Sequence, residues 1–359
     1  MPEFSLGHRK SLDGVRGMAI VFVLLSHLQN LPLQGGFIGV DLFFVLSGFL
    51  ITTLLLEEER DRGDIRLRDF YARRALRLLP ALIAMLLVMI GMSAWTDGAD
   101  DAAKMRKSAL MALFYSANWF SAFRAFPSAE LSATWSLSIE EQFYLVWPLL
   151  LRTLLRWRVS TTRIAVLAAA GLFLSAGWRA WLWRSTGSFE RVFFGSDTHS
   201  DGLLAGTLAG LLVSSGALRP TPALARTLNW GAHLTLGILM LYLRWGWEAD
   251  GYTLETGILV LNLGMAVLVL SLLFSPGPIL RAVFEFPPLV WMGRISYGLY
   301  LWHMVVYGRG GRMPLLRSAG WWPLTVAATI GVAAASFYLL ERPMLRWKRR
   351  FERVPSSAP

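Results

Sequence analysis

The sequence contains no cysteine, few charged residues and almost no lysine. Without a thiol, disulfide bonds, thiolate metal sites and a cysteine-linked acyl intermediate are excluded. Only 16% of the 359 residues are charged, against about a quarter in an average soluble protein, whereas 55% are apolar. These proportions exclude a soluble enzyme, a secreted disulfide-rich domain and a disordered chain.

The apolar residues lie in runs of about 20, the length that crosses roughly 30 Å of hydrocarbon. Eleven segments have this character: 12–31, 37–56, 72–95, 108–122, 135–155, 164–183, 200–216, 229–246, 254–274, 289–307 and 321–340. We therefore expect an all-α, polytopic transmembrane helical bundle, whose membrane domain covers residues 1–345.

The positive charge predicts which of these segments cross the bilayer. The net charge of +11 sits in short connections and comes mainly from arginine, which indicates topology and not a nucleic-acid partner. The connection 57–77 holds seven arginines, so it and both termini should be cytoplasmic. The basic loop after Arg152 also faces inward only if 108–122 does not span. We expect about ten spanning helices and a short re-entrant or interfacial helix near 108–122.

Two basic segments complete this topology for a bacterial cytoplasmic (inner) membrane protein. The loop with Arg309, Arg312 and Arg317 is the one external connection that runs against the rule. The basic tail 346–359 is expected to be cytoplasmic and disordered at its end.

The first span carries ionisable side chains, which in a membrane segment indicate function by default. Arg16 and His27 are 11 residues apart, about 20° from whole helical turns, so they share one face and lie about 16 Å apart along the axis. Asp13 precedes Arg16 by three residues and is able to pair with it. The alternative for His27 is a packed histidine that bonds across the bundle.

Charged residues mark three further segments. Asp41 enters the second span among Gly35, Gly36, Gly39 and Gly48, where the glycines allow close helix packing and Asp41 is structural or functional. In the third, Arg74 and Arg77 share a helix face, with Arg73 beside them, and would grip phosphate in bidentate fashion or simply anchor the helix at anionic lipid. Glu140 and Glu141 enter an otherwise apolar and aromatic helix.

With the predicted topology, the polar groups separate by depth. His27, Asp41, Glu140, Glu141, Asp201 and His303 fall toward the outer half, and the arginines 73, 74 and 77 at the inner face. An enzyme that takes a long, phosphate-headed donor from the cytoplasm would need this layout.

These blocks resemble the acyltransferase-3 family of integral-membrane O-acyltransferases, often called OafA-type O-acetyltransferases. The matching blocks occur in the family's order and cover nearly the whole chain: LDGVRG at 12–17 with Arg16-x10-His27, GVDLFFVLSGFLIT at 39–52, FYARRALRLLP at 70–80, TWSLSIEEQFYLVWP at 134–148, ISYGLYLWH at 295–303 and ERP at 341–343.

The resemblance implies transfer of an acyl group, usually acetyl from acetyl-CoA, to a sugar hydroxyl of an extracytoplasmic or lipid-linked glycan. It implies that His27 is the catalytic base and that Arg16 belongs to the same essential motif. It also implies that Arg74 and Arg77 bind the CoA phosphates, and Glu140 matches a glutamate of the family's fifth motif. Many relatives have an arginine where this chain has His199. No esterase-like segment follows, so the acceptor would be handled in the membrane domain or with a partner.

The chemistry agrees with this reading. An imidazole titrates near neutral pH and is suited to activate a hydroxyl. Glu140 or Asp41 would orient the His27 ring. Direct transfer is the simpler route, although an acyl-histidine or acyl-serine intermediate stays open. No metal-ligand spacing appears.

Two rival functions stay open: a transporter or flippase of a lipid-linked glycan, and a non-catalytic assembly subunit. The sequence leaves the acceptor, the acyl chain length and the oligomeric state open.

Overall fold

A computed structural model of the protein describes residues 5–28, 33–219, 221–247, 249–274, 276–310 and 322–348, and all regular structure there is helical. The main helices are α1 (Lys10–Ser26), α2 (Ile38–Arg62), α3 (Leu67–Thr96), α4 (Ala99–Leu113), α5 (Ala117–Ala122), α6 (Thr134–Arg156), α7 (Thr161–Thr186), α8 (Phe189–Phe194), α9 (Asp201–Ser214), α10 (Pro222–Trp245), α11 (Ile258–Phe274), α12 (Pro278–Phe284), α13 (Pro287–Arg294), α14 (Ser296–Gly310), α16 (Trp322–Ser336) and α17 (Arg342–Lys348). Short 3-10 or π turns are η1 (Gln34–Phe37), η2 (Ala129–Leu131), η3 (Thr253–Gly257) and η4 (Phe337–Glu341).

The expected all-α class is confirmed, and five helical segments are long and apolar enough to cross a membrane: Gln34–Arg62, Leu67–Thr96, Thr161–Thr186, Thr253–Phe274 and Trp322–Leu345. The prediction of about ten spans is therefore supported for five. The other expected segments are also helical, but α1, α9 and α14 are short and α6 carries several charges. Burial against neighbouring helices accommodates polar groups there that lipid would exclude.

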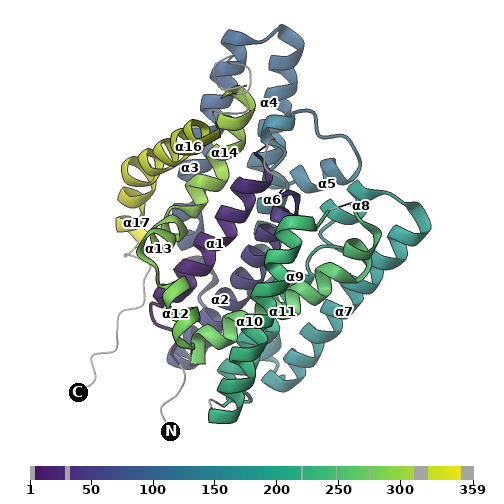
Figure 1. Ribbon diagram of the computed structural model, residues 1–359. Helices are drawn as coiled ribbons and strands as arrows, with labels where there is room; N and C mark the ends of the chain where they lie inside the picture. Colours follow the sequence, from purple (N-terminus) through teal and green to yellow (C-terminus); the bar gives the residue numbers. More distant parts are fainter. Residues whose placement is uncertain are drawn as a thin grey trace.

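α1 lies in the middle of the bundle, with α2 and α13 against it (Figure 1). Glycines make this packing possible. A Cβ at Gly36 of η1 or Gly39 of α2 would come within 2.2 or 2.3 Å of a backbone oxygen of α1, and one at Gly17 would come within 2.0 Å of the Leu289 oxygen. Small residues let helix backbones approach closely where no hydrophobic force drives association. The predicted packing role of the α2 glycines is confirmed.

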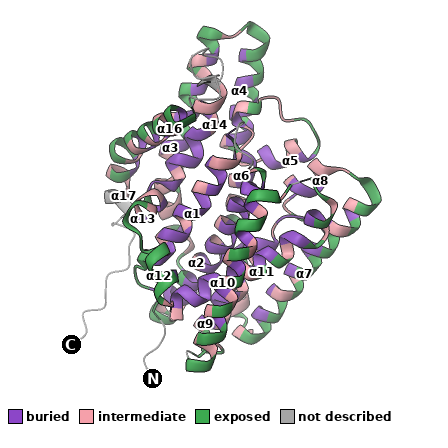
Figure 2. Ribbon diagram, viewed as in Figure 1, coloured by how far each residue is buried: buried purple, intermediate pink, exposed green. Residues whose placement is uncertain are grey.

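Burial follows the same arrangement, because buried positions concentrate on the inward faces while α7 and α10 expose residues on their outer sides (Figure 2). Many of these exposed residues are large and apolar, for example Leu174 at 72% and Leu234 at 67%. A soluble protein rarely leaves such surface to water, so the pattern fits a lipid-facing exterior.

Both arginine-rich connections lie at one end of the bundle. Asp64, in the turn after α2, accepts hydrogen bonds from Arg152 at 2.9 and 2.7 Å and from Arg156 at 3.0 Å, near the end of α6. Hydrogen bonds from Arg152, followed by those from Arg156, lower the pKa of Asp64 below its ordinary value, although some burial opposes this. We call this end the basic end. Which side of a membrane it faces stays a prediction.

The segment 108–122 differs from the expected single short helix. Helix α4 begins at Ala99 and ends at Leu113, a turn with Tyr115 at positive φ follows, and α5 begins at Ala117. Hydropathy placed the start of this segment too late, because the first turn of α4 carries acidic residues and is therefore not apolar. Met105 and Ala109 of the same helix pack against α3. Residues 311–321, with Arg312 and Arg317, and the tail 349–359 lie outside the described residues.

Candidate active site

Three arginines from two helices gather around one carboxylate near the basic end. Arg16 of α1 and Arg77 of α3 interact electrostatically with Glu140 of α6, with each other and with Arg74 of α3. Among the described residues, none of the three arginines lies within salt-bridge distance of a carboxylate, and the Nε atom of Arg16 is buried without a hydrogen-bond partner. Guanidinium groups held together in this way are suited to bind phosphate oxygens.

Glu140 itself is held by neutral hydroxyl groups. Ser47 of α2 and Tyr144, one turn further along α6, both donate short hydrogen bonds to its Oε1 atom. The guanidinium of Arg74 lies 3.9 Å from the centroid of the Tyr144 ring. The Glu140 carboxylate is thus held by hydroxyl groups and not by the arginines. The guanidinium N–H groups of the arginines are therefore available to bind a ligand.

Two more acidic residues border the cluster. Glu141 interacts electrostatically with Arg74 and Arg77, and Glu341 of η4 with Arg77. Glu341 is 5% exposed, and its Oε1 atom has no hydrogen-bond partner within the described segments.

Arg73 has a different environment from its two neighbours in sequence. Its Nη2 atom lies 3.1 Å from Oε2 of Glu58, which is 1% exposed at the end of α2. Glu58 also accepts a bond from the backbone N–H of Arg66. Of the three arginines predicted for the phosphate site, the structure therefore brings two to the cluster and pairs the third with a buried carboxylate.

A cavity continues from the arginine cluster between α1, α2, α6 and α14. It is lined by Arg16, Val40, Phe43, Phe44, Ser136, Leu137, Glu140, Ser296, Tyr297 and Tyr300. Its polar groups are engaged on one side, because the Tyr297 hydroxyl donates to the Leu78 oxygen and the Tyr300 hydroxyl to the Ala133 oxygen. The cavity therefore joins a cationic end to a wall of aromatic side chains.

His27 lies at the other end of α1, as the residue that ends the helix. Its Nδ1 atom is 2.8 Å from the Val23 carbonyl oxygen. A carbonyl only accepts, so Nδ1 carries the proton, and in the neutral ring Nε2 holds a lone pair. The His27 side chain is exposed, so this lone pair is accessible to a substrate. The expectation that Glu140 or Asp41 orients this ring is wrong, since a backbone oxygen does so.

His303 of α14 packs against the His27 ring. The two ring centroids are 4.9 Å apart, and Tyr300 and Tyr307 lie 5.3 and 6.0 Å from His303 on the same helix. Both histidines lie toward the end of the bundle opposite the basic end, about 16 Å along α1 from Arg16.

Asp41 belongs to a separate buried cluster. Its Oδ1 atom is 3.1 Å from Nε2 of His199, whose Nδ1 atom is 2.6 Å from the Phe193 oxygen. Both ring nitrogens therefore face acceptors, which requires a second proton shared between imidazole and carboxylate. A protonated His199 ring supplies a cation beside Asp41. Arg179, which is fully buried, makes a bidentate pair with Asp201 nearby.

Asp13 does not pair with Arg16. Its Oδ2 atom lies 2.9 Å from Nε2 of His8 and 3.5 Å from Nε of Arg294. Asp13 thus pairs with Arg294 of α13, and with Arg16 it interacts only electrostatically, without a hydrogen bond.

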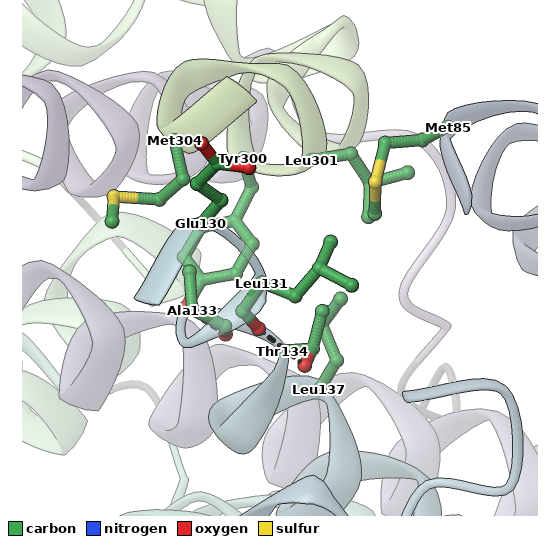
Figure 3. Close-up of a pocket in the computed structure, with 9 residues that line it drawn as sticks. All are labelled: Met85, Glu130, Leu131, Ala133, Thr134, Leu137, Tyr300, Leu301 and Met304. Carbon is green, nitrogen blue, oxygen red and sulfur yellow. Dashed lines mark hydrogen bonds between the residues drawn. The ribbon is translucent and has the colours of Figure 1, made fainter. Parts of the chain in front are cut away.

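A second, smaller pocket lies where η2 and the start of α6 meet α14 (Figure 3). Glu130, Thr134 and Tyr300 contribute its polar groups, and Thr134 donates to the Leu131 oxygen at 2.6 Å. Leu137 and Tyr300 also line the first cavity, so the two pockets share these side chains as a wall. Within the described segments, no group of three or more histidine, aspartate or glutamate side chains is able to hold a metal ion.

Comparison with known proteins decides the family. The profile described as acyltransferase domain matches residues 9–341, nearly the whole chain. The chain belongs to the acyltransferase-3 family. The resemblance drawn from the sequence blocks is thereby confirmed.

Several curated acyltransferase-3 relatives are similar over almost all of this chain. The peptidoglycan O-acetyltransferase OatA of Listeria monocytogenes is 32% identical across 95% of the chain, which spans 56% of that protein. The putative peptidoglycan O-acetyltransferase YrhL of Bacillus subtilis is 33% identical across 93%, spanning 54% of its length. A putative O-acetyltransferase of Staphylococcus aureus (strain COL) is 31% identical across 92%. The chain thus spans about half the length of these relatives. No solved structure matches it.

Sequence reasoning missed the hydroxyl groups that complete this acyltransferase-3 site. Ser47, Tyr144, Tyr297 and Tyr300 carried no charge to attract attention. One signal was available: Tyr144 follows Glu140 by four residues and therefore lies on the same helix face.

Proposed function

We propose that this protein is a membrane O-acetyltransferase that moves an acyl group from cytoplasmic acyl-CoA to a hydroxyl of an extracytoplasmic or lipid-linked glycan, with His27 as the general base. The observation that carries the proposal is the path along α1. At one end stand three arginines that have no ion-pair partner among the described residues, and at the other a histidine whose lone pair is accessible. A cavity leads from the first toward the second. The names of the curated relatives support the reaction class.

The arginine cluster fits the charged part of an acyl-CoA. Phosphate groups satisfy guanidinium hydrogen bonds in pairs, and the orphaned Nε atom of Arg16 needs an acceptor. In CoA an extended arm separates the phosphates from the thioester, as about 16 Å of helix separates Arg16 from His27. The donor would therefore enter at the basic end and present its acyl carbon near the two histidines.

The tautomer of His27 fits the role of base. Because Nδ1–H is fixed on the Val23 oxygen, Nε2 is the atom that takes a proton. The thioester supplies an activated acyl carbon. As the acceptor oxygen bonds to that carbon, its proton passes to Nε2, the carbon–sulfur bond breaks, and the CoA thiolate leaves and is protonated. The charge that develops on the ring is adjacent to the Val23 carbonyl, which stabilises it.

The experiment is release of CoA thiol from acetyl-CoA by the full chain in lipid nanodiscs. Because the protein has no cysteine, a thiol reagent reports only CoA. We expect His27→Gln, which retains a polar group but cannot take up a proton, to lower turnover about 10²- to 10⁴-fold. The matched control is His233→Gln, because Nδ1 of His233 also bonds a carbonyl one turn earlier, at 2.7 Å.

Wild-type turnover in His27→Gln would refute the role of the base. No thiol release by the wild type with any acceptor, together with movement of a lipid-linked glycan, would establish the transporter instead.

A further inference from the structure

The two imidazoles present two hydrogen-bond acceptors side by side and no donor. Nδ1 of His303 lies 2.6 Å from the Tyr300 oxygen, so it carries the proton, as in His27. The Nε2 atom of His303 therefore holds a lone pair. His303 is fully buried, and among the described residues Nε2 has no hydrogen-bond partner.

In the part of the chain that the structure describes, no neighbouring hydroxyl supplies the missing donor. The Tyr300 hydroxyl is bonded to the Ala133 oxygen at 2.9 Å, and that of Tyr307 lies 3.4 Å from the Leu24 oxygen. Leaving a buried acceptor without a donor is costly, and a protein tolerates it mainly where another molecule supplies the donor. Since no described residue does so, we expect a bound molecule to supply it.

We propose that His303 is a second acceptor-binding residue, whose Nε2 accepts a hydrogen bond from the hydroxyl next to the one that His27 deprotonates. This inference rests on the proposed function. It commits to a chemical class of acceptor, a sugar with two neighbouring hydroxyls, because two lone pairs on adjacent rings need two donors that are close together. Carboxylates and phosphates have no hydrogen to donate at neutral pH.

The surroundings suit a sugar ring. Tyr300 and Tyr307 flank His303 and present ring surface, and small-molecule sites commonly combine such apolar walls with a few placed polar groups. The exposed side of His27 leaves the site open to an acceptor, while the donor approaches along the cavity from Arg16.

The test uses two small acceptors that differ in one donor. cis-Cyclohexane-1,2-diol has two neighbouring hydroxyls, and its monomethyl ether keeps one. With acetyl-CoA and the full chain in nanodiscs, thiol release above the water background and the ester product are measured for each. We expect the wild type to prefer the diol, and His303→Phe to lower kcat/KM for the diol about tenfold, mostly through KM, while the value for the ether falls much less.

Two further variants separate binding from folding. His303→Gln places an amide oxygen near the position of Nε2 and should restore most of the preference for the diol. His233→Phe removes a histidine with the same Nδ1 contact elsewhere and should leave the preference unchanged. Thermal unfolding of each variant shows which are folded.

The outcomes distinguish this inference from the proposed function. If the wild type shows no preference for the diol, or if His303→Phe lowers both rates equally, the inference is overturned while acyl transfer stands. If the wild type releases no thiol with either acceptor or with water, the proposed function fails and the inference fails with it.

Discussion

Replacing Arg77 by lysine should weaken acyl-CoA binding although the charge is kept. Within the described part of the chain, Arg77 has no ion-pair partner and faces Arg16 and Arg74, so its guanidinium is available to phosphate. Lysine supplies a point charge and loses the bidentate contact. One charge-assisted hydrogen bond contributes about 1.5–3 kcal/mol. A loss of about 2 kcal/mol raises Kd roughly 30-fold.

The assay is thermal unfolding of the nanodisc protein with and without acetyl-CoA. A ligand at 100 times its Kd stabilises the folded state by about 2.7 kcal/mol. After a 30-fold loss of affinity the same concentration contributes only about 0.9 kcal/mol. Dephospho-CoA should stabilise the wild type less than CoA itself if the cluster holds the 3′-phosphate.

Arg73 provides the matched control from the same helix turn. Because it pairs with the buried Glu58, Arg73→Gln should lower the unfolding free energy without ligand by about 1–3 kcal/mol. The shift produced by acetyl-CoA should be as large as in the wild type. Equal ligand-induced shifts in Arg77→Lys and wild type, or a shift lost only in Arg73→Gln, would refute the assignment of the phosphate site.

Three predictions concern groups outside the arginine cluster. Arg179→Met should destabilise the protein by about 3–5 kcal/mol, since it leaves Asp201 charged and buried, and full wild-type stability on thermal unfolding would contradict this. His199→Arg should be tolerated because a cation still faces Asp41, whereas His199→Leu should unfold at markedly lower temperature; equal melting of the two variants would disprove the ion pair. The pKa of Asp64 is lowered in the folded protein, so its contribution to stability is complete above the ordinary carboxyl pKa near 4 and disappears as the pH falls below it. Asp64→Asn should therefore lower the unfolding free energy by under about 1 kcal/mol at pH 7 and by less at pH 3. An equal difference between variant and wild type across pH 3–7 would contradict this.

The helical fold was predictable because the hydropathy of each segment depends only on its own residues. Runs of apolar residues predict helices whether or not these cross the bilayer, and in the described residues each of the eleven predicted segments contains helix, although 108–122 is divided between α4 and α5. The basic connections predicted that the α2–α3 turn and the end of α6 face the same side, and the contacts of Asp64 place both at one end of the bundle, while the side of the membrane stays a prediction. The expectation that α1 and α6 span the membrane stays a prediction, because α1 has only 17 residues and α6 carries several charged residues.

The candidate site was predictable by residue type but not by pairing. An ionisable residue in an apolar helix is conspicuous, so Arg16, His27, Arg74 and Glu140 stood out. Which groups meet depends on helix rotation and depth, which one chain does not encode locally. Asp41 was therefore assigned to His27, although it faces a histidine 158 residues away in sequence.

Arg16 lies within helix α1 and His27 directly follows its last residue, so one helix sets the distance between them. Glycines pack this helix directly against the backbones of its neighbours. A Cβ at Gly293 of α13 would come within 1.8 Å of the Asp13 oxygen, so α1 has no room to slide or turn at its arginine end. The distance between the group that would hold the donor's phosphates and the group that would take the proton is consequently a constant of the molecule. The proposed site would therefore select donors by the distance between phosphate and thioester. An acyl thioester on a shorter arm would bind the arginines with its phosphates, but its reactive carbon would not reach His27.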